Sequence, residues 1–154
     1  MRIVVCSDSH GSARNLMLAV DQQPKADAYV FLGDGIRDAE ILRSRGKPAY
    51  FVKGNCDGAL PCPIYETLTL AGKTVLCTHG HYDQVKFGLD ILLYRAQERG
   101  ADICLFGHTH APYIGYEDGV HLFNPGSIQE GIYGFVDIVS GGIVCRHVKV
   151  RNIF

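Results

Sequence analysis

The sequence predicts an α/β domain in which an alternating first half is followed by a half rich in strands. In the first half, three apolar, β-branched segments alternate with segments of helical character, and the links between them are short. In the second half, short apolar segments are separated by turn sequences such as "EDG", "NPGS" and "SGG". A chain of 154 residues is an ordinary length for one domain, so we expect a single domain over residues 1–154.

The first half is expected to form three parallel strands joined by helices in right-handed crossovers. Continuous apolar runs are typical of strands that are buried on both faces. The first helix has apolar residues at helical spacing, with Ser12 as its N-cap and Pro24 after its end. A more polar helix over residues 38–45 is stopped by Gly46 and Pro48. The three strands are expected over residues 2–7, 28–34 and 49–55.

The second half is expected to contain one more helix and several short strands. The spacing i, i+3, i+4, i+7 of four apolar residues, from Leu89 to Ala96, predicts an amphipathic helix that ends near Gly100. The segment "IYETLTLAGKTVLCTHG" predicts two strands joined at "AGK". Further strands are expected over residues 102–108, 113–119, 120–123, 133–139 and 142–150.

The composition excludes several classes of partner. The formal net charge is −1, so no field of the whole protein attracts a nucleic-acid polymer or an anionic membrane. The apolar run at the N-terminus is too short for a signal peptide, and none approaches the roughly 20 residues that cross a bilayer. On the last strand His147, Lys149 and Arg151 alternate with valines, which predicts a solvated face. We therefore expect a cytoplasmic protein that binds neither membrane nor nucleic-acid polymer.

Six cysteines occur without the CxxC spacing of a zinc knuckle. A cytoplasmic chain of this length does not need disulfides. We expect the four cysteines in strand-like runs to be small buried thiols, namely Cys6, Cys77, Cys104 and Cys145.

Metal-binding side chains follow five of the expected strands. In open α/β sheets, ligands bind at the carboxyl ends of the strands. Taken singly, each motif has an ordinary explanation, since "GD" is usually a turn and closely spaced histidines serve many roles. Agreement at five strand ends indicates one site. Its expected ligands are Asp8, His10, Asp34, Asn55, His79, His108 and His110.

The donor set favours transition metals. Imidazole, carboxylate and amide donors suit manganese, iron, cobalt, nickel or zinc. An open catalytic ion takes about three protein ligands, so seven donors fit two ions that share a carboxylate. Two ions about 3.5–4 Å apart are a common arrangement for the hydrolysis of phosphate esters.

The motifs "DSH", "GD", "GNCD", "HGH" and "GHTH" occur in this order over residues 8–110, followed by "NPGS" at 124–127. With this ordered set the chain resembles the calcineurin-like metallophosphoesterases, and among them the small single-domain phosphodiesterases of bacteria and archaea. The resemblance implies a four-layer α/β sandwich, in which two facing β-sheets are flanked by helices.

The resemblance also implies a role for each ligand. Asp8, His10, Asp34 and His110 would bind one divalent ion, and Asp34, Asn55, His79 and His108 would bind the other, with Asp34 bridging. A hydroxide between the ions would be the nucleophile, so no nucleophilic side chain is expected. Manganese is the expected metal, with nickel, iron, cobalt and zinc as alternatives. Asp57 is expected to orient a ligand or to fix a loop.

One position departs from the family pattern. Many members have a histidine after the asparagine of "GNCD", where it can protonate the leaving group, whereas this chain has Cys56. A neutral thiol is a weak donor, so phosphate monoesters with basic leaving groups are expected to be poor substrates. His81 is either a replacement donor or a histidine without a catalytic role.

We expect the protein to hydrolyse a small phosphodiester. One alternative is a broad-specificity phosphatase or nuclease of the same fold. Another is a non-catalytic protein-interaction scaffold, a use of this fold found in a retromer subunit whose metal site is degraded. The sequence is compatible with a homo-oligomer.

Overall fold

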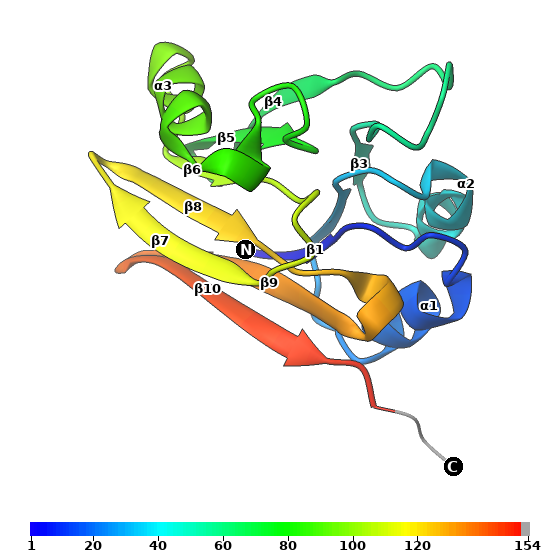
Figure 1. Ribbon diagram of the computed structural model, residues 1–154. Helices are drawn as coiled ribbons and strands as arrows, with labels where there is room; N and C mark the ends of the chain where they lie inside the picture. The colour runs from blue at the N-terminus through cyan, green and yellow to red at the C-terminus, as the bar shows by residue number, and fades with distance from the viewer. Residues whose placement is uncertain (152–154) are drawn as a thin grey trace.

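The computed structural model describes residues 1–151 and contains two five-stranded sheets with helices on their outer sides (Figure 1). The first sheet has the order β10-β9-β1-β2-β3, and the second has the order β4-β5-β6-β8-β7. The strands are β1 (Arg2–Cys6), β2 (Ala28–Phe31), β3 (Ala49–Phe51), β4 (Tyr65–Leu70), β5 (Lys73–Thr78), β6 (Ile103–Leu105), β7 (Tyr113–Glu117), β8 (Val120–Asn124), β9 (Ile132–Val139) and β10 (Gly142–Lys149). The α-helices are α1 (Ala13–Asp21), α2 (Ile36–Ala39) and α3 (Asp90–Glu98), and 3-10 turns cover Glu40–Arg45, Val85–Phe87 and Ile128–Glu130.

Strands from both halves of the chain build the first sheet. β1, β2 and β3 are parallel, as the alternation of strands and helices predicts. β9 pairs antiparallel with β1, and β10 pairs antiparallel with β9. The hairpin of β9 and β10 therefore belongs to the same sheet as β1. Nothing in the sequence pattern predicts this pairing.

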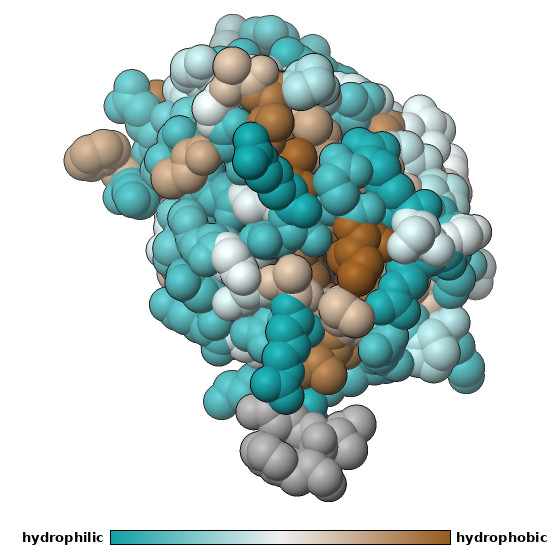
Figure 2. Space-filling view, turned by 90° about the vertical axis from the view of Figure 1, so that its right-hand side faces the viewer, coloured by the Kyte–Doolittle hydropathy of each residue, from teal (hydrophilic) through white to brown (hydrophobic). Residues whose placement is uncertain are grey.

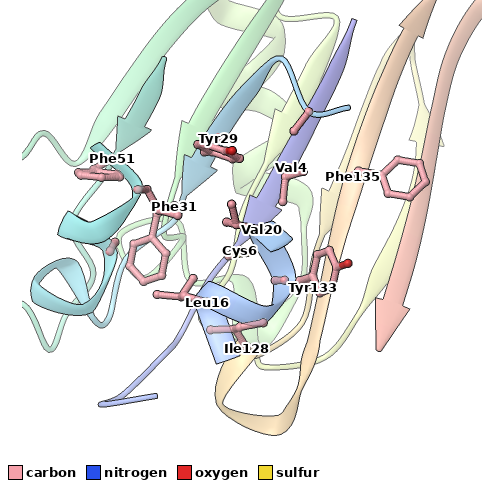
Figure 3. Close-up of a cluster of buried hydrophobic side chains, with 14 of the residues drawn as sticks. Val4, Cys6, Leu16, Val20, Tyr29, Phe31, Phe51, Ile128, Tyr133 and Phe135 are labelled. Atoms are coloured by element: carbon pink, nitrogen blue, oxygen red, sulfur yellow. The ribbon is translucent and has the colours of Figure 1, made fainter. Parts of the chain in front are cut away.

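Alternate side chains of β1 and β2 enter two different hydrophobic layers. Val4 and Phe31 point toward α1 and α2 on the outer face of the first sheet, in the cluster that Figure 3 shows. Val5 and Val30 point toward the second sheet instead. Because both faces of these strands are covered, their sequences are continuously apolar.

The second sheet is covered on its outer face by α3. Ile103 and Leu105 of β6 enter the layer between the sheets, whereas Cys104 packs with Leu92 and Ala96 of α3. In Figure 1, α3 lies beside β5 and β6, away from α1 and α2. The order of layers is helix, sheet, sheet, helix, which confirms the four-layer sandwich.

The thiols follow the expectation closely. Cys6, Cys77 and Cys104 are buried and Cys145 is half-buried, and all six cysteines are free. Burial raises the pKa of Cys145 to about 11, so its thiol is protonated at neutral pH.

Two local expectations need correction, one on the polar helix and one on the N-cap of α1. The polar helix expected over residues 38–45 begins two residues earlier, at Ile36, and becomes a 3-10 turn after Ala39. It begins there because an Asp57 oxygen accepts the N–H group of Ile36. Ser12 stands at the N-cap of α1, but its side chain makes no capping hydrogen bond.

The expectation of a solvated face on β10 is wrong for His147. Lys149 is exposed, but His147 is half-buried, its ring stacks on Phe123, and its Nε2 lies 2.7 Å from the carbonyl oxygen of Asn124. The alternation of polar and apolar residues missed this because a histidine ring can pack and hydrogen-bond at the same time.

Hydrophilic residues cover much of the side of the molecule that is shown in Figure 2, and smaller hydrophobic areas lie between them. This is the side at the right of Figure 1, where α1 and α2 lie. No helix of residues 1–151 has both the length and the apolar character needed to cross a bilayer.

Candidate metal centre

Backbone hydrogen bonds connect the loops that follow the strands. The N–H groups of Asp8 and His10 donate to the carbonyl oxygens of Gly33 and Asp34, which joins the loops after β1 and β2. The N–H group of Gly107 donates to the carbonyl oxygen of His79 over 2.9 Å, which joins the loops after β6 and β5. The N–H group of His108 donates to Oδ2 of Asp8 over 3.1 Å, which joins the loops of the two sheets. Six of the seven expected ligands therefore converge from both sheets at one edge of the sandwich.

Five of the seven expected ligands have left-handed backbone conformations. Only eight of the described non-glycine residues have positive φ, and these five are among them. Such conformations are uncommon outside glycine, and they concentrate at functional sites that the surrounding structure holds in place. The five residues are Asp8 (φ 56°), His10 (φ 42°), Asp34 (φ 61°), His108 (φ 70°) and His110 (φ 62°).

Asp8, His10 and His110 form one potential cation site. One ligand atom from each lies within 4.8 Å of the other two. Oδ1 of Asp8 lies 3.2 Å from Nε2 of His110 and 3.7 Å from Nε2 of His10, and the two Nε2 atoms are 3.4 Å apart.

Asp34, His79 and His108 form a second potential cation site. Nε2 of His79 lies 3.2 Å from Oδ2 of Asp34 and 3.1 Å from Nδ1 of His108. The same Oδ2 of Asp34 lies 3.8 Å from Nε2 of His10 in the first group. Asp34, a member of the second group, therefore also lies near the first group.

One carboxylate oxygen at the centre has no hydrogen-bond partner. Asp8 is fully buried, and its Oδ2 accepts hydrogen bonds from the Ser7 hydroxyl and the His108 N–H group. Its Oδ1 is buried without a partner and faces the imidazoles of His10, His79 and His110. An unpaired buried charge is costly, and a cation at this position would remove that cost. The residues therefore fit a metal ion.

His79 presents one nitrogen to the centre. Its Nδ1 lies 2.7 Å from the carbonyl oxygen of Leu32, so this nitrogen carries the proton and Nε2 is directed at Asp34. Metal-binding histidines have this arrangement, in which the second nitrogen donates to a backbone carbonyl. Burial lowers the pKa of His79, but Asp34 and Asp8 outweigh burial and raise the pKa overall.

The pKa values of Asp34 and His108, on either side of His79, are both lowered. Burial opposes ionisation of Asp34, but the hydrogen bond and charge of His79 hold its pKa well below the usual range. Burial, with His79 nearby, lowers the pKa of His108 to about 4. Asp34 is therefore ionised and His108 neutral at pH 7, the states in which both can bind a metal.

Asn55 is the one expected ligand that no contact places at the centre. Its side chain is exposed, and its amide nitrogen lies 3.5 Å from Sγ of Cys56. Sγ of Cys56 instead belongs to a third potential group, with His10 and Asp34. Burial and the nearby Asp34 raise the pKa of Cys56, so its thiol stays protonated at neutral pH.

Asp57 accepts four backbone hydrogen bonds. The N–H groups of Asp34 and Gly54 donate to Oδ2 over 2.7 Å, and those of Gly35 and Ile36 donate to Oδ1 over 2.8 and 3.1 Å. Asp57 thereby joins the loop that carries Asp34 to the loop that carries Asn55. Its oxygens are directed at the backbone, and Asp57 belongs to none of the potential cation groups.

His81 lies beside the centre without joining it. Its ring centre is 5.4 Å from that of His79 and 6.1 Å from that of His108, and its ring stacks on Tyr82. Its Nδ1 is buried and has no hydrogen-bond partner. Burial and His79 lower the pKa of His81.

Two supporting residues escaped the sequence analysis. Oδ2 of Asp38 accepts hydrogen bonds from the Ser9 hydroxyl and the Gly11 N–H group, on either side of His10. The amide of Asn124 donates to Oγ1 of Thr109, between the two histidines of "GHTH". The motif "NPGS" was a signal for Asn124, whereas Asp38 resembles any polar residue of a short helix.

Comparison with known proteins decides the family. Residues 1–138 match the model of the calcineurin-like phosphoesterase superfamily domain. The chain belongs to this superfamily. Among its relatives in the superfamily, the probable metallophosphoesterase YsnB of Bacillus subtilis is 35% identical over 130 residues, which cover 84% of this chain and 76% of YsnB. The phosphodiesterase YfcE of Escherichia coli is 31% identical, with 84% of this chain and 80% of YfcE covered.

Solved structures of similar proteins agree with the superfamily fold. A predicted phosphoesterase from Streptococcus pneumoniae aligns with a TM-score of 0.83 and 31% identity, over 96% of this chain and 88% of that protein. Vps29 from Entamoeba histolytica, in complex with zinc, aligns with a TM-score of 0.76 and 20% identity, over 98% and 100% of the two chains. At that identity the second likeness concerns the fold alone.

Metal binding should stabilise the protein more as the pH rises. The raised pKa of His79 means that the metal-free fold gains stability from protonated His79 at low pH and loses it as the pH rises through that pKa. A metal needs neutral imidazoles, so its affinity should increase above about pH 6.5. At 100-fold excess over Kd, Mn²⁺ should add about 2.7 kcal/mol, or roughly 5–10 °C in Tm. Differential scanning fluorimetry between pH 5.5 and 8 measures this, and a Tm unaffected by Mn²⁺ at every pH would contradict it.

Asp57→Asn should weaken metal binding because an amide nitrogen cannot accept the hydrogen bonds that one carboxylate oxygen accepts. We expect a loss of about 2–3 kcal/mol in the free energy of unfolding and a loss of about 10–100-fold in metal affinity. Urea unfolding and calorimetric titration with Mn²⁺ measure both. The control is the same substitution at an exposed turn residue, Asp118→Asn. Equal behaviour of the two variants would show that Asp57 does not position the centre.

Proposed function

We propose that this protein is a phosphodiesterase that depends on two divalent metal ions and hydrolyses a small phosphodiester with water as the nucleophile. The observation that carries the proposal is the pair of adjacent His/Asp groups, with Asp34 of the second group close to His10 of the first, together with the unpaired buried Oδ1 of Asp8. When bound, the two ions would activate water and neutralise charge on the phosphate.

The residues of the chain would hold this chemistry in place. Asp8, His10, Asp34 and His110 are the proposed ligands of one ion, and Asp34, Asn55, His79 and His108 are those of the other. Asp8 and Asp34 contribute two negative charges, which two divalent ions outweigh, so the centre would attract an anionic phosphate. Asp57 and Asp38 keep the loops in position through backbone hydrogen bonds.

Cys56 supports a diester in preference to a monoester. Its protonated thiol lies in the group with His10 and Asp34, where an acid could reach a departing oxygen, but a thiol is a weak proton donor. A diester whose leaving group departs as a stabilised anion needs little protonation of that group. His81 is the other candidate donor, because its ring lies near those of His79 and His108.

The alternatives differ in what they require of the same residues. A non-catalytic scaffold requires neither an unpaired buried carboxylate oxygen nor five proposed ligands with positive φ. These features therefore favour the enzyme. A broad-specificity phosphatase or a nuclease of the same fold would share the centre and differ in substrate. A net charge of −1 does not favour a nucleic-acid polymer.

We extend the proposal to the metal, the domain organisation, the location and the oligomeric state of the enzyme. Manganese is the proposed metal, ahead of nickel, iron, cobalt and zinc. We propose one domain over residues 1–154, since side chains of both sheets share one hydrophobic layer; residues 152–154 lie outside the described part. A cytoplasmic location and a homo-oligomer remain part of the expectation from the sequence.

Asp34→Asn should abolish turnover and reduce the number of bound metals. The substitution keeps the shape but removes the charge shared by both groups, so we expect at least a 100-fold loss in kcat, about the effect of removing one electrostatic stabiliser. Turnover of bis(4-nitrophenyl) phosphate with Mn²⁺ and metal content by elemental analysis are the measurements. Asp118→Asn is the matched control. Two metals and unimpaired turnover in Asp34→Asn would overturn the bridging assignment.

Cys56→His should reduce the dependence of the rate on the leaving group. An imidazole at this position could act as a general acid, which typically contributes about 10²–10⁴-fold for leaving groups that need a proton. Aryl diesters should change little, and alkyl esters should gain. A linear free-energy plot over a series of esters measures the slope, with metal content checked in the same variant. An unchanged slope with intact metal content would assign proton donation to His81 or to water.

A further inference from the structure

A hollow of about 390 Å³ opens directly beside the proposed metal centre. His10, Asp34 and Cys56, which form one of the potential cation groups, line one part of it. Its wall continues along α2 and the loop after β3, where Arg37 and Leu60 line it. A phosphodiester whose phosphorus lies at the centre would therefore direct one of its two ester substituents into this hollow.

The acidic side chains of the hollow are already engaged. Both oxygens of Asp57 accept backbone N–H groups, and Oδ2 of Asp38 accepts the Ser9 hydroxyl and the Gly11 N–H group. Oδ1 of Asp34 accepts the N–H group of Cys56. Each of these carboxylates therefore accepts at least one N–H group, which offsets part of its negative charge.

Arg37 is the only lysine or arginine among the residues that line the hollow, and it is exposed. The next arginines along the chain are paired: Arg43 with Glu40 over 3.0 Å and Arg45 with Asp21 over 2.7 Å. Within residues 1–151, no ion pair or side-chain hydrogen bond engages the guanidinium of Arg37. Its donors are therefore free for a ligand, and a guanidinium suits the two oxygens of a carboxylate or a phosphate.

We propose that the hollow is a substituent subsite, in which Arg37 selects phosphodiesters that carry a second anionic group, a carboxylate or a phosphate, on one ester substituent. This inference rests on the proposed function and narrows its substrate class. Because Arg37 is exposed, its contribution is that of a partly solvated ion pair, about fivefold in kcat/KM at low ionic strength. Salt should reduce the preference, since it screens exposed charges.

Two symmetric esters test the subsite, because either of their substituents can enter the hollow with the same result. One is bis(4-nitrophenyl) phosphate, and the other is bis(3-carboxy-4-nitrophenyl) phosphate. The quantity measured is the ratio of their kcat/KM values, carboxylated over uncarboxylated, with Mn²⁺ at low salt. Comparing this ratio between protein variants cancels the intrinsic reactivity of the two esters. Arg37→Ala should lower the ratio about fivefold, and Arg37→Lys should lower it by less, because lysine keeps the positive charge.

Arg146→Ala is the matched control, because Arg146 is exposed on β10 and does not line the hollow. We expect it to leave both rates and their ratio unchanged. A ratio that is the same in wild type and in Arg37→Ala would overturn the subsite while leaving the proposed function intact. Absence of turnover of both esters by metal-loaded wild-type protein would overturn the proposed function and the subsite together.

Discussion

Negative charge buried at the edge of the sandwich is the constraint on which the site depends. Asp8 is fully buried and Asp34 almost so, and they lie at the ends of adjacent parallel strands. Two carboxylates cannot stay ionised there unless positive charge or hydrogen-bond donors surround them. The donors come from N–H groups of neighbouring loops, and the two carboxylates in turn raise the pKa of His79. A metal ion at this position would supply positive charge directly.

The two sheets of the fold make this crowding achievable. β1 and β2 bring Asp8 and Asp34 from the first sheet, while β5 and β6 bring His79 and the "GHTH" histidines from the second. Glycines allow the loops to approach one another: a Cβ at Gly107 would collide with the Ser7 hydroxyl, and one at Gly54 would collide with Oδ1 of Asp34. The glycines of "GD", "GN" and "GH" are therefore as much a part of the site as the proposed ligands that follow them.

Much of this arrangement could be predicted from sequence, because strands that end in metal-binding residues have a strong and local signal. The continuous apolar runs identified the strands, and the ordered motifs identified the family and the potential ligands. The return of β9 and β10 to the first sheet has no such signal, since pairing between distant strands depends on the whole fold. The contact of His147 with Asn124, the bonds of Asp38 and the open position of Arg37 likewise depend on residues far apart in sequence or on what surrounds a side chain.

We propose that this edge of the sandwich holds two metal ions that share Asp34. The decisive measurement is a crystal structure of the Mn²⁺-loaded protein with anomalous diffraction data. We expect two anomalous peaks about 3.5–4 Å apart, one against Asp8, His10 and His110 and the other against His79 and His108, with Asp34 touching both. A single peak, or two peaks that do not share Asp34, would show that Asp34 does not bridge two metal ions.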